Sequence, residues 1–267
     1  MRNIHLIIFA LLFYSSAHSQ IPYTLNLQGI GFPTGMSAIS INENQYLYDS
    51  TSKFENAFSI SYQRSRFGLT EISPVSIMYS NNMIKNSGFF ANLDYFGFEL
   101  YNEFAASVGG YTKLKFIEIG GKATYHRANI KDYGNSSAIS VDMYAKLCLL
   151  DNLAFGLLLE NLNRAYYTNA NRTVPQSAIL SIGYTPLEQL GIDFGANIDL
   201  NTNASMIAAI RYKFNHYLQA NIKCNTSPFL IIGGINLSAF DYFNILFFLR
   251  YEEEFGYDQI IGLEFKF

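Results

Sequence analysis

The stretch YDQIIGLEFKF (residues 257–267) closes the chain and decides the fold class. Apolar and polar residues alternate in it with the period of two that is typical of a β-strand. Soluble proteins usually let their termini fray into polar residues, so an amphipathic strand that ends on an aromatic side chain indicates a surface in contact with lipid. One face of this strand carries Ile261, Leu263, Phe265 and Phe267, and the other carries Ile260, Gly262, Glu264 and Lys266.

The composition favours a membrane β-barrel. Charged residues make up 15% of the 267 residues, whereas soluble proteins average about 25%. Aromatic residues are abundant, with 20 Tyr and 23 Phe, yet beyond the N-terminus no apolar stretch reaches the roughly 20 residues of a membrane-spanning helix. A formal net charge of -3 excludes a nucleic-acid-binding protein, which would be strongly basic.

The N-terminus predicts export. Arg2 precedes an apolar run over residues 4–14, and small residues at Ala17 and Ser19 fit a signal-peptide cleavage site before Gln20. No Cys follows that site, which excludes a lipoprotein signal. The alternative is a retained anchor or a buried helix. We therefore expect a signal peptide over residues 1–19, a plug-like periplasmic segment over 20–53, and a barrel over 54–267 in the outer membrane of a Gram-negative bacterium.

Fourteen period-two segments of strand length follow the N-terminal segment, separated by Gly, Asn, Asp, Ser and Pro clusters. An even number of strands and an alternation of short and long connections are typical of a closed antiparallel transmembrane barrel with periplasmic ends. We expect short turns near 115, 150, 188 and 215, and long polar loops over 64–71, 128–137, 163–176 and 252–257. The predicted strands are 54–63, 72–80, 88–98, 104–114, 116–127, 138–149, 152–162, 177–186, 190–200, 206–214, 217–224, 229–237, 242–251 and 258–267.

Most charges within these strands fall on the less apolar face, as lipid would require, because a charge on the lipid face near the midplane costs about 2–4 kcal/mol. A soluble barrel would carry many Lys and Glu on its outer face, and neither face here does. The sequence predicts a lumen that is either a polar conduit or an interior closed by paired charges, with inward Leu158, Leu246, Phe248 and Ile260 narrowing it. The predicted lumen residues are Glu118, Lys122, Asp142, Lys146, Glu160, Asp193, Asp199, Arg211, Lys213, Arg250, Glu264 and Lys266.

Several short motifs carry a resemblance to a known family. Three of these motifs precede the first strand: Gly35-Met36-Ser37-Ala38, the turn Asn42-Glu43-Asn44, and Tyr48-Asp49. Three more lie further along the chain: Glu160-Asn161-Leu162, Val174-Pro175, and Ile182-Gly183-Tyr184-Thr185-Pro186. This pattern resembles the fatty-acid-transporter-like (FadL-like) outer-membrane barrels, in particular the PorV and PorQ branch of type IX secretion. The Asn-Pro-Ala-Gly motif that follows the Tyr in that family is absent here.

The resemblance implies a fourteen-stranded barrel that serves type IX export as an accessory or shuttle component, with secretion-system subunits or exported proteins as partners. The alternatives are a FadL-like channel for hydrophobic molecules and a structural barrel without transport. Strand 258–267 also resembles the terminal signal that the barrel-assembly machinery recognises, carried by Leu263, Phe265 and Phe267.

No pattern indicates an enzyme or a cofactor. The nucleophile-elbow, zinc-protease and phosphate-loop motifs are all absent, and no Ser–His pair stands out. A metal site formed by His126 and His216 lacks carboxylates at ligand spacing. Glu252, Glu253 and Glu254 form the one charge run, expected in a solvated outer loop, with a cation site as the alternative. Cys148 and Cys224 are expected to be isolated strand residues, although a disulfide is the alternative in an oxidising compartment.

Overall fold

A computed structural model describes residues 56–64, 73–84, 87–150, 152–168, 173–199, 204–227, 229–240, 242–253 and 256–267. The predicted signal peptide, the plug-like segment and the motifs between 35 and 49 lie outside these described residues. No helix in the described ranges has the length and apolar character needed to cross a bilayer.

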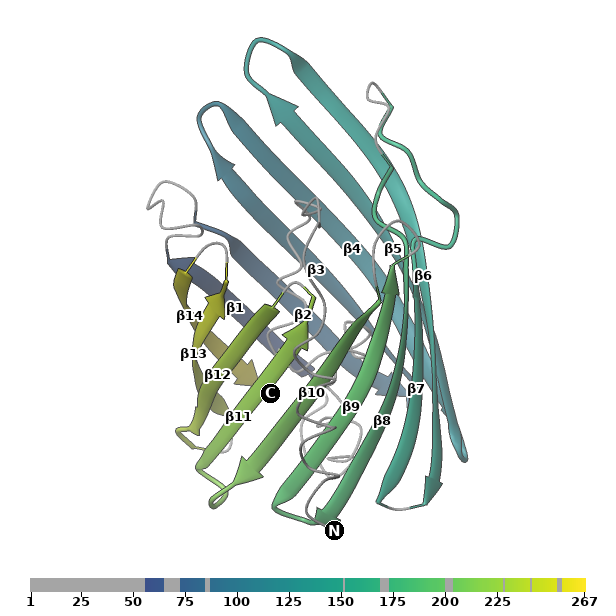
Figure 1. Cartoon of the computed structure of the whole chain (residues 1–267), viewed down its shortest axis with the longest axis vertical. Helices are drawn as coiled ribbons and strands as arrows, with labels where there is room; N and C mark the ends of the chain where they lie inside the picture. The colour runs from purple at the N-terminus through teal and green to yellow at the C-terminus, as the bar shows by residue number, and fades with distance from the viewer. Residues whose placement is uncertain are drawn as a thin grey trace, which may run out of the picture.

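The chain forms a closed antiparallel barrel of fourteen strands, as the sequence predicts (Figure 1). Each strand pairs with its neighbours in sequence, and β1 closes the barrel on β14, with Ile60 opposite Leu263. The terminal strand is therefore hydrogen-bonded on both edges, which hydrocarbon demands of every backbone group. The strands are β1 Asn56–Arg64, β2 Val75–Ile84, β3 Ser87–Phe98, β4 Tyr101–Leu114, β5 Ile117–Ile130, β6 Gly134–Leu150, β7 Leu153–Glu160, β8 Ser177–Leu187, β9 Leu190–Asp199, β10 Ser205–Lys213, β11 Leu218–Thr226, β12 Phe229–Ser238, β13 Phe243–Glu252 and β14 Gly256–Lys266.

Burial alternates along the strands with the period that the sequence predicts. On β14, Asp258, Ile260 and Glu264 are buried, whereas Ile261 and Phe265 are exposed. The exposed face is apolar on the neighbouring strands as well, since Ile261 lies opposite Tyr62 of β1 and Phe247 of β13. The apolar face thus points outward and most charged side chains point inward, which is the reverse of a soluble barrel.

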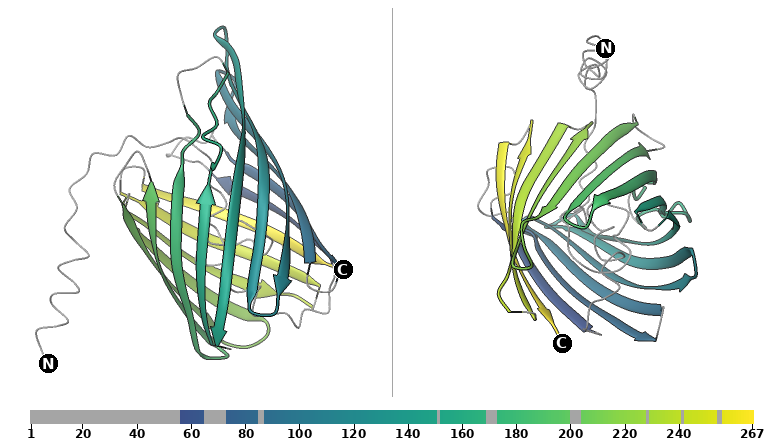
Figure 2. Two further views of the ribbon diagram at one scale, coloured as in Figure 1. Left: turned by 90° about the vertical axis from the view of Figure 1, so that its right-hand side faces the viewer. Right: turned by 90° about the horizontal axis from the view of Figure 1, so that it is seen from below.

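The predicted long loop over 128–137 is wrong. β5 continues to Ile130 and β6 begins at Gly134, so most of this stretch is strand and only a three-residue turn remains. Asp132 and Gly134 have positive φ values of 65° and 98°, which lets the chain reverse tightly there. β6 is consequently 17 residues long, and the β5–β6 hairpin rises above the rest of the rim (Figures 1 and 2).

The predicted loop over 252–257 also begins too early. Glu252 belongs to β13, is buried inside the barrel and forms an ion pair with Arg250 of the same strand. The strand alternation places its side chain inward. Glu252, the first residue of the predicted charge run, is therefore buried in the barrel interior and is not in a solvated loop.

The connection between β7 and β8 is the long segment that the sequence predicts, and it folds back on the upper part of β6. Asn161 adopts a positive φ of 51°, and its amide group donates to the Val174 carbonyl at 2.8 Å and accepts from the Ala165 amide at 2.7 Å. Asn163 bonds the Ile139 carbonyl and the Val141 amide in the manner of a paired strand. The loop therefore covers the edge of β6 where β7 has ended.

Two apolar clusters lie on the inner wall. The first joins strands β2, β3, β6, β7, β8 and β10, and the second joins β12, β13 and β14. Leu158, Leu246, Phe248 and Ile260, the inward apolar residues predicted from sequence, are all buried in these clusters. The first cluster contains Met78, Phe90, Tyr144, Leu158, Ile179, Ile207 and Ala209, and the second contains Ile232, Leu246, Phe248 and Ile260.

Glycine pairs inside strands make room for aromatic rings in these clusters. A Cβ at Gly109 would lie 2.4 Å from Cζ of Phe90, and one at Gly234 would lie 2.0 Å from Cδ1 of Phe248. At Gly109 and Gly234 the backbone therefore approaches an aromatic ring too closely for any side chain.

We expect Gly234→Ala to lower the free energy of unfolding by about 1–3 kcal/mol, because the added methyl group displaces the Phe248 ring from a filled cluster. Gly233→Ala is the matched control, since a Cβ at Gly233 meets only Ile222 at an ordinary 3.8 Å. Urea titration of both variants in lipid vesicles measures the difference. Equal stabilities would show that the Phe248 ring moves aside without cost.

Candidate functional site

The predicted lumen residues whose side chains are described lie on the inner face or at the ends of the strands that carry it. The structure does not describe the Asp199 side chain. Most of the others are removed from solvent, so each needs a polar partner, because an isolated buried charge is costly. The buried members are Glu118, Lys122, Asp142, Lys146, Asp193, Arg211 and Glu264, and the half-buried members are Glu160, Lys213, Arg250 and Lys266.

Acids and bases of this set meet across neighbouring strands. Lys122 lies opposite Asp142 in the β5–β6 register, with Nζ 3.0 Å from Oδ2 and both side chains buried. Glu118, four residues before Lys122 on β5, lies across from Lys146 of β6 in the same register. Asp142 also accepts a hydrogen bond from the backbone N–H of Asn161 at 2.8 Å, so the buried pair anchors the β7–β8 loop.

A second group of charges lies near the turn between β10 and β11. Lys266 Nζ is 3.3 Å from Oε1 of the fully buried Glu264, which also accepts a hydrogen bond from Asn244. Lys213 and Lys266 line a cavity of about 190 Å³ at this end of the barrel. His216 lines the same cavity, so the structure places the two histidines of the barrel in different cavities.

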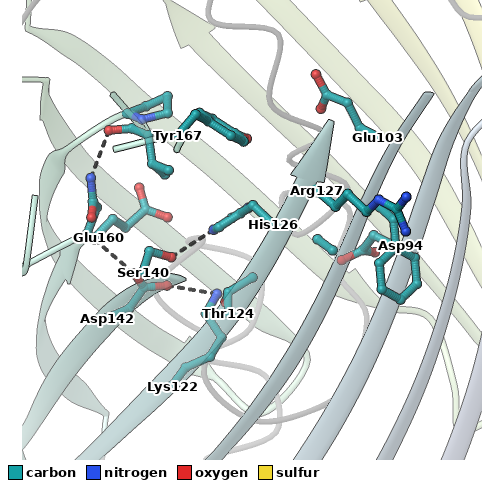
Figure 3. A pocket seen from close by; sticks show the side chains of 15 residues that line it. Asp94, Glu103, Lys122, Thr124, His126, Arg127, Ser140, Asp142, Glu160 and Tyr167 are labelled. Atoms are coloured by element: carbon teal, nitrogen blue, oxygen red, sulfur yellow. Dashed lines mark hydrogen bonds and ion pairs between the residues drawn. The ribbon is translucent and has the colours of Figure 1, made fainter. Parts of the chain in front are cut away.

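The main candidate site is a cavity of about 110 Å³ under the raised β5–β6 hairpin (Figure 3). β3 to β7 form its wall, and the β7–β8 loop supplies Tyr167, Val174 and Pro175. Four of its lining residues have carboxyl groups, and the lining also contains Lys122 and Arg127. The carboxylates are Asp94, Glu103, Asp142 and Glu160.

His126 on β5 lies in the middle of this site. Its Nε2 is 2.8 Å from Oγ of Ser140 on β6, and its ring stands edge-on to that of Tyr167 at a centroid distance of 6.5 Å (Figure 3). His126 and Ser140 are separated by 14 positions in the sequence, so no short motif contains both. The β5–β6 register reveals the pair, because His126 lies opposite Ala138, two residues from Ser140 on the same face.

Sequence reasoning missed two carboxylates of the site, Glu103 and the more deeply buried Asp94. Asp94 lies on the inner face of β3 and is 4% exposed, between outward-facing Leu93 and Tyr95. Its Oδ2 accepts a hydrogen bond from Asn92, but its Oδ1 has no hydrogen-bond partner. The alternation of residues 88–98 contains the signal that would have found it, since Phe90, Asn92 and Asp94 share one face.

Both cysteines are free thiols, Cys148 on β6 and Cys224 on β11, which agrees with the prediction of isolated strand residues. The described part of the chain contains no group of three or more His, Cys, Asp or Glu side chains that could hold a metal ion.

No protein-family model matches the chain. No curated protein matches it either. Solved structures do match. The chain is similar to the CymD monoaromatic hydrocarbon channel, with 9% identity, a TM-score of 0.61, and coverage of 88% of this chain and 94% of that one. It is also similar to the P. putida toluene transporter TodX, with 11% identity, a TM-score of 0.59 and the same coverage.

A third similar structure is the Acinetobacter baumannii outer membrane protein Omp33, with 9% identity, a TM-score of 0.55, and coverage of 80% of this chain and 98% of that one. The fold is that of outer-membrane barrels. At these identities the likeness concerns the fold alone, and the PorV and PorQ branch is not distinguished by it.

Proposed function

We propose that the mature chain spans the outer membrane of a Gram-negative bacterium and lets small apolar molecules cross it. The observation that carries this proposal is an apolar section of the inner wall, formed by the first apolar cluster, while other sections carry buried charges such as Lys122 and Asp142. Water-filled porins have a polar interior, whereas here Met78, Phe90, Leu158 and Ile179 point inward and pack together. Such a wall favours apolar solutes over ions, because an ion would lose its hydration there without compensation.

The similar solved structures also support the passage of small apolar molecules. CymD and TodX, whose barrels this chain resembles, are described as a monoaromatic hydrocarbon channel and a toluene transporter. The first apolar cluster would exclude water at rest and take up an apolar solute of that size by side-chain displacement.

The test is uptake of radiolabelled toluene by cells that express the barrel, compared with cells that do not. Met78→Gln keeps the side-chain length but places an amide in the first apolar cluster. An amide without a partner in an apolar environment costs about 1–3 kcal/mol, so we expect uptake to fall roughly tenfold. Met206→Gln is the matched control, because Met206 is exposed on the outer face near the start of β10.

Uptake that does not depend on the barrel, or equal losses in the two variants, would overturn the proposal. Conductance of simple salts by the purified barrel in planar bilayers, at the level of a water-filled pore, would contradict it independently.

The raised β5–β6 hairpin favours a second candidate function, an accessory role in type IX secretion through protein contacts. The hairpin stands above the rim, and its tip residue Tyr133 is 89% exposed. Pull-down with the tagged barrel tests this role: secretion-system subunits or exported clients should be recovered with the intact barrel and lost when residues 128–137 are replaced by a short turn. Recognition of Leu263, Phe265 and Phe267 by the assembly machinery remains a prediction.

A further inference from the structure

The cavity under the raised hairpin is lined by a buried carboxylate, Asp94, with one oxygen that accepts no hydrogen bond. Oδ1 of Asp94 has no hydrogen-bond partner although the residue is 4% exposed and lines the cavity. Burying a carboxylate oxygen without a donor is unfavourable, and native structures rarely leave such groups unexplained. A ligand that brings its own donor would satisfy this oxygen.

The charge around Asp94 indicates what kind of donor fits. Glu103 on β4 lies on the same inner face, two positions along from Ala105, which is opposite Asp94. The Glu103 carboxylate accepts a hydrogen bond from the Tyr101 hydroxyl and adds a second negative charge to this side of the cavity. Lys122 is 3.0 Å from Asp142, and the lining as a whole holds four carboxylates against Lys122 and Arg127. A cationic ligand is therefore favoured over an anionic one.

The remaining lining distinguishes an organic cation from a metal ion. Metal sites need three or more ligating side chains close together, and the described part of the chain contains no such group. An ammonium group has three donors and needs only scattered acceptors. The rings of His126 and Tyr167 form an aromatic wall in the same cavity, against which a short carbon chain would pack (Figure 3).

We propose that this cavity binds a small primary organic ammonium, with the cation at Oδ1 of Asp94 and its carbon chain toward the rings of His126 and Tyr167. The cavity of about 110 Å³ suits a molecule of a few heavy atoms, since an engineered cavity of about 150 Å³ holds benzene. This site would bind an ammonium whether or not the barrel conducts apolar molecules, because it involves none of the side chains of the first apolar cluster.

The experiment uses the purified full-length mature barrel in detergent and ligand-observed NMR with n-propylammonium as the probe. 1-Propanol has the same number of heavy atoms without the charge, and propionate has the opposite charge. We expect saturable binding of n-propylammonium and at least tenfold weaker binding of the other two. Equal binding of 1-propanol would overturn the proposal, since it would show that the cavity takes any small amphiphile.

Asp94→Asn keeps the shape of the side chain and removes its charge. Hydrogen bonds to charged groups contribute about 1.5–3 kcal/mol, so we expect n-propylammonium to bind this variant roughly 10- to 100-fold more weakly. Asp193→Asn is the matched control, because Asp193 is equally buried on β9 and does not line the cavity. Unchanged binding by Asp94→Asn, or an equal loss in Asp193→Asn, would contradict the assignment.

Heat-modifiable migration on SDS gels reports whether each variant is folded. If Asp94→Asn does not fold, Glu103→Gln decides the matter, because Glu103 is only half-buried and its replacement disturbs the interior less. We expect this variant to bind n-propylammonium at least threefold more weakly, and wild-type affinity in a folded Glu103→Gln barrel would then overturn the proposal.

Discussion

Ile261→Arg should lower the free energy of unfolding of the lipid-embedded barrel by about 2–4 kcal/mol, the cost of an Arg on the lipid face near the bilayer midplane. Ile261 lies at the middle of β14, is exposed, and faces outward between Tyr62 of β1 and Phe247 of β13. In a soluble barrel an outward-facing Arg would cost almost nothing. The substitution therefore separates a lipid environment from water.

Tyr257→Arg is the control on the same strand and face. Tyr257 is 73% exposed at the loop end of β14, where a charge lies near the interface and costs about 0–1 kcal/mol. Urea titration of both variants in phospholipid vesicles, followed by gel mobility, measures the two free energies. Equal effects would mean that the outer face is not in hydrocarbon and would remove the basis of the membrane assignment.

The barrel itself was predictable because its pattern is local. A period of two fixes which face each residue occupies, so the alternation on β14 and the number of strands followed from the sequence. The height of the β5–β6 hairpin was not predicted, because residues 128–137 are polar enough to read as a loop. Only the positive φ at Asp132 and Gly134, which the residue types Asp and Gly permit, indicates the tight turn.

The candidate site was harder to predict, because its geometry depends on pairing between strands. The sequence placed Lys122 and Asp142 on the same face as other charges, but only the β5–β6 register shows that they form a pair. The same register brings Ser140 to His126. The inward fold of the β7–β8 loop depends on the conformation of Asn161. Its side chain donates to the Val174 carbonyl and accepts from the Ala165 backbone amide, as a neighbouring strand would. No periodicity encodes such contacts.

Lys122→Met should destabilise the barrel by about 3–5 kcal/mol, the largest effect we expect. Breaking a buried ion pair from one side leaves the other charge uncompensated, and Asp142 is as buried as Lys122. The loss extends to the β7–β8 loop, because the backbone N–H of Asn161 donates to the same carboxylate. We therefore expect faster proteolysis of residues 161–176 together with a lower urea midpoint.

The exposed pair of Lys131 and Glu99 near the outer rim is the matched control. Exposed ion pairs contribute about 0–1 kcal/mol, so Lys131→Met should leave the urea midpoint almost unchanged. The double variant Lys122→Met with Asp142→Leu completes the cycle. Removing both charges together should cost less than Lys122→Met alone, because no charge is then left buried without a partner. A double variant less stable than Lys122→Met would show that Asp142 acts mainly through Asn161, and that the loop, rather than the ion pair, holds this part of the interior together.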